Sequence, residues 1–496
     1  MNKIGFDNDK YLKLQSEKIK ERIAMLGGKL YLEFGGKLFD DNHASRVLPG
    51  FLPDSKLRML LELKDQAEII IAINANDIEK NKIRGDLGIT YDLDTLRLID
   101  IFKGLGLYVG SVVLTMFASQ PAAIAFQQRL EKVGIPVYRH YAIDGYPSNI
   151  NKIVSDEGYG KNEYIPTSRS LVVVTAPGPG SGKMATCLSQ LYHDYKRGIK
   201  AGYAKFETFP VWNLPLKHPV NLAYESATAD LNDINMIDSF HLEAYGEKTV
   251  NYNRDIEIFP VLNAMLTKIM GVSPYKSPTD MGVNMAGYCI CDDEVCRAAS
   301  RQEMIRRYLD AAVEVKKGEL PLSVLSKHDI LLQDAGITLA ERPIIQKSLD
   351  KAAATGGPAV AIELNDGRII TGKTSILLGA SAAAVLNALK VLANIDDDER
   401  IIAPEIIKPI EDLKINHFGS HNPRLHIEEM LIALSVSSAT SENAKKAIDK
   451  LGDLQHAQAH STVILASGDR NTFKKLGINV TSEAVYQVKK LYHGGH

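Results

Sequence analysis

The chain has 496 residues, 45% of them hydrophobic and 24% charged, which is a globular composition with enough apolar residues for more than one core. Lys and Arg number 58 against 60 Asp and Glu, so the formal net charge is -2 and no global positive field favours nucleic acid or an anionic membrane. We therefore expect two or three domains, with neither nucleic acid nor a membrane as partner. Whether the chain forms a homo-oligomer stays open.

The N-terminal segment, MNKIGFDNDKYLKLQSEKIKERIAML, is charged throughout and predicts an amphipathic helix rather than a signal peptide. No apolar run approaches the roughly 18 residues that a membrane-spanning helix needs. Four cysteines in a chain of this length do not indicate a disulfide framework. These features together favour the cytoplasm.

Residues 1–225 alternate apolar runs with helical patterns. The helix-like segment SQPAAIAFQQRLEKVG has Ser119 as its expected cap and Pro121 in its first turn. Continuous apolar strands that alternate with helices predict a mostly parallel sheet covered on both faces, a three-layer α/β domain. The candidate strands are KLYLEF, EIIIAI, SVVLTMF, IPVYRHYAI, SLVVVTA and GYAKFETF.

The pattern changes twice along the rest of the chain. Helical periodicity dominates 226–335 and predicts a helical subdomain. From 336 to 496 the alternation returns, opening with a hairpin, AVAIELNDGRIITG, around Asp366-Gly367, and ending with STVILAS, which has the composition of a strand. The sequence thus predicts a multidomain α/β protein with a separate C-terminal α/β domain.

The segment LVVVTAPGPGSGKMATCLSQL places a glycine-rich loop between a strand and a helix. Gly178, Gly180 and Gly182 let backbone N–H groups turn inward around an anion, and the following helix start and Lys183 add positive charge. This arrangement predicts a phosphate-binding site made by Gly178, Gly180, Ser181, Gly182 and Lys183.

The same loop departs from a nucleotide-hydrolysing phosphate loop. Only three residues separate Gly178 from Gly182, Pro177 stands at the expected first glycine, and Met184 replaces the hydroxyl that would bind Mg²⁺. Ordinary Mg²⁺-dependent ATP hydrolysis is therefore not favoured, and the metal dependence stays open. In the alternative interpretation, the glycines merely allow a tight turn and close packing.

Lys205 and Glu207 follow near the end of the next predicted strand. Ligands of parallel α/β sheets collect beyond the carboxyl ends of strands, so these side chains are candidates for the same crevice, with Glu207 as a catalytic group. An exposed ion pair on an edge strand is the alternative. Asp280 is a further catalytic candidate because it lies in a long polar loop, SPYKSPTDMGVNMAG, although this loop also suits a plain connection.

The cysteines and histidines do not have the spacing of known zinc sites. Cys289, Cys291 and Cys296 lack a fourth ligand at zinc-site spacing, which favours buried thiols and no metal site. In HAQAHST, Ala457 occupies the position where a zinc protease has Glu, so that chemistry is disfavoured. His460 is a candidate for proton transfer or phosphate binding, and a structural histidine is the alternative.

Gly35-Gly36-Lys37 follows a predicted strand and resembles the opening of amino-acid kinases over a few residues only. A wider resemblance rests on KLYLEFGGKLFDDNHASRVLPGF, TAPGPGSGKMATCLSQLYHDY, SPTDMGVNMAG, DDEVCRAASRQEMIRRY, AHSTVIL and LGINVTSEAVY. Over essentially its full length, the chain resembles a conserved bacterial family of unknown function. Some members carry an automatic label of ATP-dependent zinc protease, which the missing zinc motif does not support. The resemblance implies a multidomain α/β protein and no established activity.

Two functions follow from these observations. The first is a cytosolic enzyme, a transferase or ligase, that binds a nucleotide or another small phosphorylated ligand at residues 178–183. The second is a non-catalytic ligand sensor or homo-oligomeric scaffold that uses the same pocket. A general acid or base with a perturbed pKa beside the loop would favour the enzyme.

Overall fold

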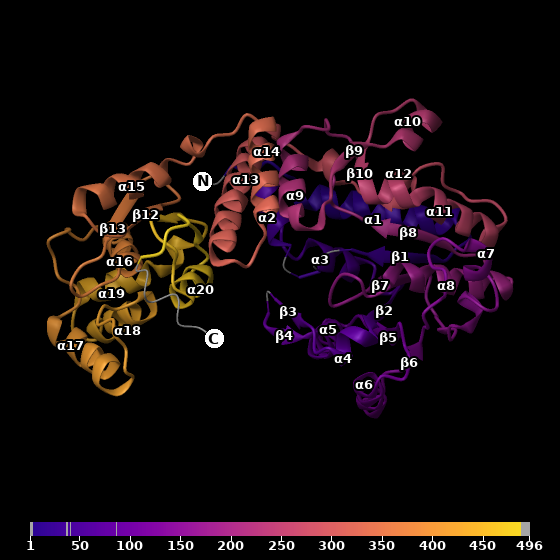
Figure 1. Cartoon of the computed structure of the whole chain (residues 1–496), viewed down its shortest axis with the longest axis horizontal. Coiled ribbons are helices and arrows are strands. Elements are labelled where there is room, and N and C mark those ends of the chain that lie inside the picture. Colours follow the sequence, from indigo (N-terminus) through magenta and orange to yellow (C-terminus); the bar gives the residue numbers. More distant parts are fainter. Residues whose placement is uncertain (1–2, 36–37, 40, 86, 488–496) are drawn as a thin grey trace. The chain divides into compact units, whose positions relative to one another are not determined.

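The computed structural model describes residues 3–35, 38–39, 41–85 and 87–487 (Figure 1). Contacts divide the chain into an N-terminal unit, Ile4–Ser300, and a C-terminal unit that starts at Arg301 and includes Lys3. Residues 226–300, expected in a helical subdomain, belong to the N-terminal unit. The boundaries at 225/226 and 335/336 stay predictions.

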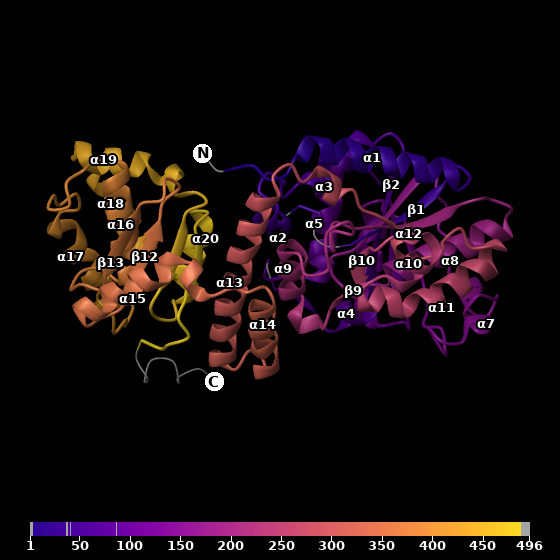
Figure 2. The ribbon, with the colours of Figure 1, turned by 90° about the horizontal axis from the view of Figure 1, so that it is seen from above.

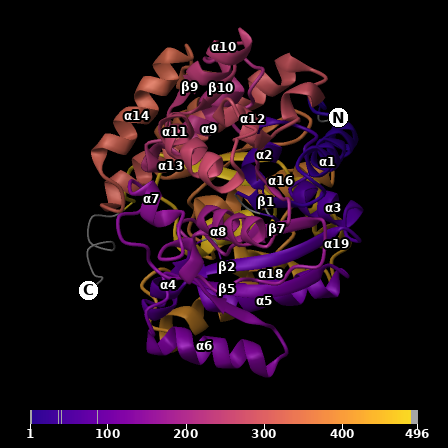
Figure 3. The same ribbon diagram turned by 90° about the vertical axis from the view of Figure 1, so that its right-hand side faces the viewer.

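Seven parallel strands form the sheet of the N-terminal unit, in the order β11-β8-β1-β7-β2-β5-β6 within the described residues. Figure 3 shows β1, β7, β2 and β5 following one another in this order, with α6 beyond them. The six strands expected before residue 225 are all present. The bounds of the seven strands are β1 (Leu30–Phe34), β2 (Ala67–Asn74), β5 (Tyr108–Thr115), β6 (Val137–Arg139), β7 (Leu171–Thr175), β8 (Gly202–Phe206) and β11 (Gly282–Val283).

Helices cover both faces of this sheet, as expected for strands that are apolar along most of their length. Helix α8 (Lys183–Lys196) packs on β1, β7 and β8, whereas α1 (Asn8–Met25) packs on β8 and β11 from the other side (Figure 2). Tyr31, Tyr203 and Leu188 are buried in one apolar cluster between the sheet and α8. Fully burying such a side chain contributes about 1.5–3 kcal/mol, so this layer holds α8 against the sheet.

The strand order contains one reversal. The chain moves outward from β2 through β5 to β6, and then returns across β2 to form β7 on its other side. Loops that leave β2 and β7 therefore diverge at the carboxyl edge of the sheet, which is where parallel α/β proteins bind ligands.

The remaining elements of the N-terminal unit surround the sheet or form two small antiparallel pairs. The helices are α2 (Asn42–Val47), α3 (Ser55–Glu62), α4 (Ala75–Glu79), α5 (Tyr91–Gly104), α6 (Pro121–Lys132), α7 (Ile150–Ile153), α9 (Pro219–Ala227), α10 (Ser239–Tyr245), α11 (Asn253–Met270) and α12 (Pro278–Met281). The strand pairs are β3 (Ile83–Arg84) with β4 (Ile89–Thr90), and β9 (Asn235–Ile237) with β10 (Val250–Tyr252). Helix α13 (Asp293–Lys317) contains the division at residue 300.

A four-stranded sheet of order β13-β12-β14-β15 forms the C-terminal unit, with the predicted hairpin at its edge. The hairpin lies between α15 and α16 in Figures 1 and 2. A Cβ on Gly372 would lie 2.1 Å from the backbone nitrogen of Ala384, so this glycine lets the alanine-rich α16 approach the sheet closely. The bounds are α14 (Leu322–Asp334), α15 (Pro343–Thr355), β12 (Ala359–Glu363), β13 (Ile369–Lys373), α16 (Ala380–Leu392), α17 (Pro404–Asp412), α18 (Ile427–Ser437), α19 (Glu442–Asp449), β14 (Gln458–Ser461), α20 (Ser467–Lys475) and β15 (Asn479–Ser482).

Two local predictions were wrong. Ser119 does not cap α6, because the helix begins after Gln120 and Ser119 has a positive φ of 62°. The strand expected in STVILAS is Gln458–Ser461 instead, so the residues of HAQAHST do not form a helix. Among the described residues, no helix combines the length and the apolar composition needed to cross a membrane.

Candidate site at the carboxyl edge of the parallel sheet

The predicted phosphate loop joins β7 to α8 at the carboxyl edge of the sheet. Strand β7 ends at Thr175 and α8 begins at Lys183. Gly180 and Gly182 have positive φ angles of 73° and 84°, which favour glycine. A Cβ on Gly180 would meet nothing within 4 Å, so this glycine faces open space. Two of the three glycines thus adopt backbone conformations that residues with a side chain rarely take.

The outer glycines of the loop also serve close packing. A Cβ on Gly178 would lie 2.3 Å from the hydroxyl oxygen of Tyr91, and one on Gly182 would lie 3.0 Å from the side chain of Thr115. The Thr115 hydroxyl donates a 2.8 Å hydrogen bond to the carbonyl of Ser181. The loop therefore lies against the carboxyl end of β5, and the packing interpretation holds for two of its three glycines.

Hydroxyl groups in the loop are already used by its own backbone. Ser181 donates to the carbonyl of Gly178 and Thr186 to that of Gly182, each at 2.9 Å. No side chain caps α8, and its first turn holds no acidic residue. Half-buried Lys183 forms no ion pair within the described part of the chain. The groups left for an anion are the backbone N–H groups of the helix start and the ammonium of Lys183.

Two strands away, Lys205 lies between two carboxylates. Its ammonium is 2.8 Å from Glu207 and is also paired with Asp255 in the first turn of α11. Only 7% of Glu207 is exposed, and β11 lies outside β8 in the sheet. The alternative of an exposed pair on an edge strand is therefore wrong.

The ionisation of this cluster depends on burial and on its opposite charges. Burial raises the pKa of Glu207 to about 7, although the neighbouring Lys205 ammonium acts in the opposite direction. Asp255 and Glu207 raise the pKa of Lys205 above its ordinary value, against the effect of burial. A carboxyl group that titrates near neutrality suits a general acid or base.

The raised pKa makes Glu207 a pH-dependent element of stability. Between about pH 4.5 and 7 the folded state keeps a proton that the unfolded state releases, so this residue lowers the free energy of unfolding as the pH rises. We expect Glu207→Gln to remove this trend. The measurement is urea unfolding at pH 5 and at pH 8. From the lower to the higher pH, the free energy of unfolding of the variant minus that of wild type should increase by roughly 1–3 kcal/mol. The exposed Glu17→Gln should leave the trend unchanged, and parallel profiles for wild type and Glu207→Gln would contradict the assignment.

Glu33, which was not among the site residues predicted from the sequence, lies beside this cluster. It is opposite Val174 on one side and Lys205 on the other, because β1 lies between β7 and β8. The Tyr203 hydroxyl donates a 2.7 Å hydrogen bond to Glu33 Oε2. The sequence pattern that could have indicated Glu33 is a carboxylate near the end of the apolar run KLYLEF. Such a residue lies at the carboxyl edge of the sheet.

Asp280 lies in α12, two residues before β11, and so at the amino end of that strand. Its Oδ2 accepts hydrogen bonds from the Tyr245 hydroxyl and the Lys276 backbone N–H, both at 2.9 Å. No hydrogen bond or ion pair within the described ranges joins Asp280 to the loop or to Lys205. These contacts fasten α10 to α12, and a catalytic role for Asp280 stays a prediction.

His460 belongs to the C-terminal unit, where it lies fully buried in β14. Its Nδ1 is 2.9 Å from the Thr481 hydroxyl and its Nε2 is 3.1 Å from Glu483. Burial lowers the pKa of His460 below its usual range. Both ring nitrogens thus have structural partners, while the predicted role in proton transfer stays untested. Gly36 and Lys37 of the kinase-like Gly35-Gly36-Lys37 segment lie outside the described residues.

The cysteines differ in accessibility. Burial raises the pKa of the Cys289 thiol to about 11 and that of Cys296 to about 12, and Cys187 is fully buried. Cys291 is exposed. Among the described residues, no group of three or more His, Cys, Asp or Glu side chains is arranged to hold a metal ion.

We expect one thiol to react first in the native protein, because only a thiolate is a strong nucleophile and only Cys291 is exposed. A thiol-specific disulfide reagent at pH 7.5 should modify Cys291 quickly and the other three cysteines only on unfolding. Cys291→Ser should abolish the fast phase. Elemental analysis of the purified chain should find no stoichiometric zinc; tightly held zinc that Cys291→Ser releases would overturn the assignment of these thiols.

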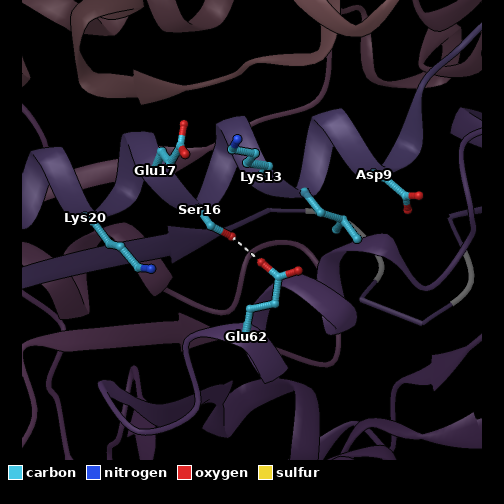
Figure 4. A pocket seen from close by; sticks show the side chains of 7 residues that line it. Asp9, Lys13, Ser16, Glu17, Lys20 and Glu62 are labelled. Atoms are coloured by element: carbon cyan, nitrogen blue, oxygen red, sulfur yellow. Dashed lines mark hydrogen bonds between the residues drawn. The ribbon is translucent and has the colours of Figure 1, made fainter.

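A shallow groove of about 370 Å³ opens between α1 and α3 (Figure 4). Ser16 donates a 3.1 Å hydrogen bond to Glu62 across it. Charged side chains of both signs, Asp9, Lys13, Glu17 and Lys20, line its α1 side. The groove shares no residue with the loop or with the Lys205 cluster, and its mixed, exposed charges select no particular ligand.

Fold and site define an α/β protein with a glycine-rich loop and a buried ion-pair cluster on the carboxyl edge of one parallel sheet. Residues 4–336 match the family model "Domain of unknown function DUF1846, N-terminal", and residues 340–492 match "Domain of unknown function DUF1846, C-terminal". The chain belongs to the DUF1846 family. The resemblance to a conserved bacterial family of unknown function is thereby confirmed.

Curated relatives cover the chain almost completely. A UPF0371 protein of Streptococcus thermophilus is 59% identical over 492 residues, which are 99% of this chain and 100% of that protein. A UPF0371 protein of Streptococcus pyogenes serotype M5 is 58% identical over the same length and with the same coverage. Their names carry no activity, so the function has to be argued from the site.

Proposed function

We propose that this chain is an enzyme that binds a nucleotide or another small phosphorylated molecule at residues 178–183, and that it catalyses phosphoryl transfer or ligation. The loop supports the binding half of this proposal. It offers backbone N–H groups without a side-chain cap, a positive helix end and a lysine with no ion pair to the described residues, at the position where the strand order reverses. Gly180 and Gly182 contribute backbone geometry, and Lys183 contributes charge.

The observation that favours an enzyme over a sensor is the raised pKa of Glu207. A site that only holds phosphate has no need for a buried carboxyl group that titrates near pH 7 on the same sheet edge. In the proposed reaction, Glu207 accepts the proton of an attacking hydroxyl or amine as that group bonds to phosphorus. The bond from phosphorus to the leaving oxygen breaks, the leaving oxygen keeps the electron pair, and Lys205 stabilises its negative charge. Backbone N–H groups and Lys183 neutralise the phosphate.

Metal dependence belongs to the test of the proposal. Met184 supplies no oxygen at the usual Mg²⁺ position, so we expect phosphate binding to need no added Mg²⁺. Calorimetry with ATP, pyrophosphate and sugar phosphates, each with and without Mg²⁺, is the direct measurement. Failure of all these ligands to bind would remove the proposal.

Catalysis is tested separately from binding. Phosphorus NMR should follow consumption of whichever ligand binds, in the presence of candidate acceptor hydroxyl or amine compounds. Glu207→Gln should keep the ligand affinity and lose at least 100-fold in rate, the usual contribution of a general base. Binding without any turnover across such a panel would favour the non-catalytic sensor instead.

A further inference from the structure

Glu33 places a negative charge beside the proposed phosphate loop, and this charge needs an explanation. Its strand β1 is paired directly with β7, the strand that enters the loop. Tyr31 and Tyr203 lie in the apolar cluster under α8, and Glu33 lies on the Tyr31 side of β1 because side chains alternate along a strand. Glu33 therefore lies on the same face of the sheet as α8.

The charges of Glu33 and Lys183 act on a common neighbour. Cys187, one helical turn after Lys183, has its pKa raised by burial and by Glu33, while Lys183 lowers it. The pairing of β1 with β7, which leads into the loop, and this common neighbour place Glu33 and Lys183 in the same region of the carboxyl edge. A ligand phosphate bound at Lys183 would thus have the Glu33 carboxylate within the same small site.

One oxygen of Glu33 is available to a ligand. Tyr203 donates to Oε2, and among the residues that the structure describes no hydrogen bond or ion pair is made by Oε1. Glu33 is only partly buried, so part of the residue reaches solvent. A carboxylate accepts hydrogen bonds and cannot donate them, so its natural partner on a ligand is an N–H or a hydroxyl group.

Two kinds of group make a carboxylate useful next to a phosphate. One is a divalent cation, which would need further oxygen ligands, and the described residues contain no cluster of three metal-ligating side chains. The other is a sugar or polyol hydroxyl, which acidic side chains at the ends of parallel strands bind in nucleotide sites. The available ligand set favours the hydroxyl.

We infer that the ligand is a phosphorylated polyhydroxy compound, a sugar or polyol phosphate, whose hydroxyl groups donate to Glu33 while its phosphate binds the loop at Lys183. This inference rests on the proposed function, since it concerns the same site. It adds the class of the substrate and assigns Glu33 as the residue that distinguishes hydroxylated phosphates from other phosphate esters.

Calorimetry with matched ligands tests the inference. Glucose 6-phosphate and glycerol 3-phosphate carry hydroxyl groups, whereas ethyl phosphate presents the same phosphate without them. We expect wild type to bind at least one hydroxylated ligand 10-fold or more tighter than ethyl phosphate, as a hydrogen bond to a charged group allows. Glu33→Gln should lose this preference and keep its affinity for ethyl phosphate, and Lys183→Ala should weaken both kinds of ligand.

Two control variants separate the outcomes. Tyr203→Phe removes the hydrogen bond to Glu33 but keeps the carboxylate, so the preference for hydroxyls should survive if the variant folds. Glu17→Gln, on the exposed face of α1, should behave as wild type. Lys183-dependent binding of ethyl phosphate with no preference for hydroxylated ligands would overturn this inference alone. Absence of binding by every phosphate ester would overturn the proposed function with it.

Discussion

Lys205→Met is expected to cause a large loss of stability. The substitution leaves Glu207 and Asp255 close together in a partly buried position, with no cation between them. Removing one member of a buried pair costs about 3–5 kcal/mol, and because 30% of the Lys205 side chain is exposed we expect about 2–4 kcal/mol at pH 8. Urea unfolding followed by circular dichroism measures this loss.

The loss should depend on pH in a defined direction. The pKa of Glu207 is already raised to about 7, and removing the ammonium raises it further, so the folded variant takes up a proton as the pH falls. Protonation relieves the repulsion, and the deficit at pH 5.5 should be smaller than at pH 8. Lys18→Met, which removes an exposed i,i+3 pair with Glu21, serves as the control and should have little effect at either pH. A deficit that is equal at both pH values would argue against a charge-based cause.

Lys183→Ala is expected to have the largest effect on ligand binding. If the loop binds phosphate, the ammonium of Lys183 contributes a charge-assisted hydrogen bond worth about 1.5–3 kcal/mol, a loss of roughly 10- to 150-fold in affinity. Stability should hardly change, because Lys183 forms no ion pair with the described residues. Calorimetry with the phosphate ligand that wild type binds measures the loss of affinity, and thermal unfolding measures the stability.

Matched variants separate the charge of the loop from its geometry. Gly180→Val should weaken binding at least as much, because its φ of 73° is unfavourable for a β-branched residue. Met184→Thr should not create Mg²⁺-dependent binding. Lys103→Ala, an exposed lysine near the end of α5, makes the same change of net charge elsewhere and should leave binding intact. Equal affinity of wild type and Lys183→Ala for every ligand would contradict a phosphate loop.

Strand composition made most of the fold predictable. Runs such as IIIAI and LVVV are apolar at every position, and only a strand buried on both faces accounts for them. The Asp366-Gly367 hairpin was equally predictable, since Gly367 has a positive φ of 86°. The shortest strand could not be predicted. Because β11 has only two residues, Gly282 and Val283, its sequence carries no periodicity.

The candidate site could be predicted only where its residues are contiguous. Residues 178–183 form one segment with a recognisable pattern, and the structure places them at the end of β7 as expected. Glu33 and Asp255 come from distant parts of the chain. The strand order brings Glu33 beside Lys205, and the packing of α11 brings Asp255 to it. Because that order depends on tertiary contacts rather than local preference, no sequence window contains the cluster.

The position of β1 has a consequence for synthesis on the ribosome. This strand is the first of the sheet to be made, yet its two neighbours, β7 and β8, lie at residues 171–175 and 202–206. Until about 140 further residues have been synthesised, the strand Leu30–Phe34 has no native partner on either side, and its second partner follows about 30 residues later. Such long-range parallel pairing folds slowly and exposes hydrophobic edges while it waits. The nascent chain is therefore a natural client of chaperones that shield apolar segments near the ribosome, and the N-terminal unit completes its sheet only after β11 has emerged.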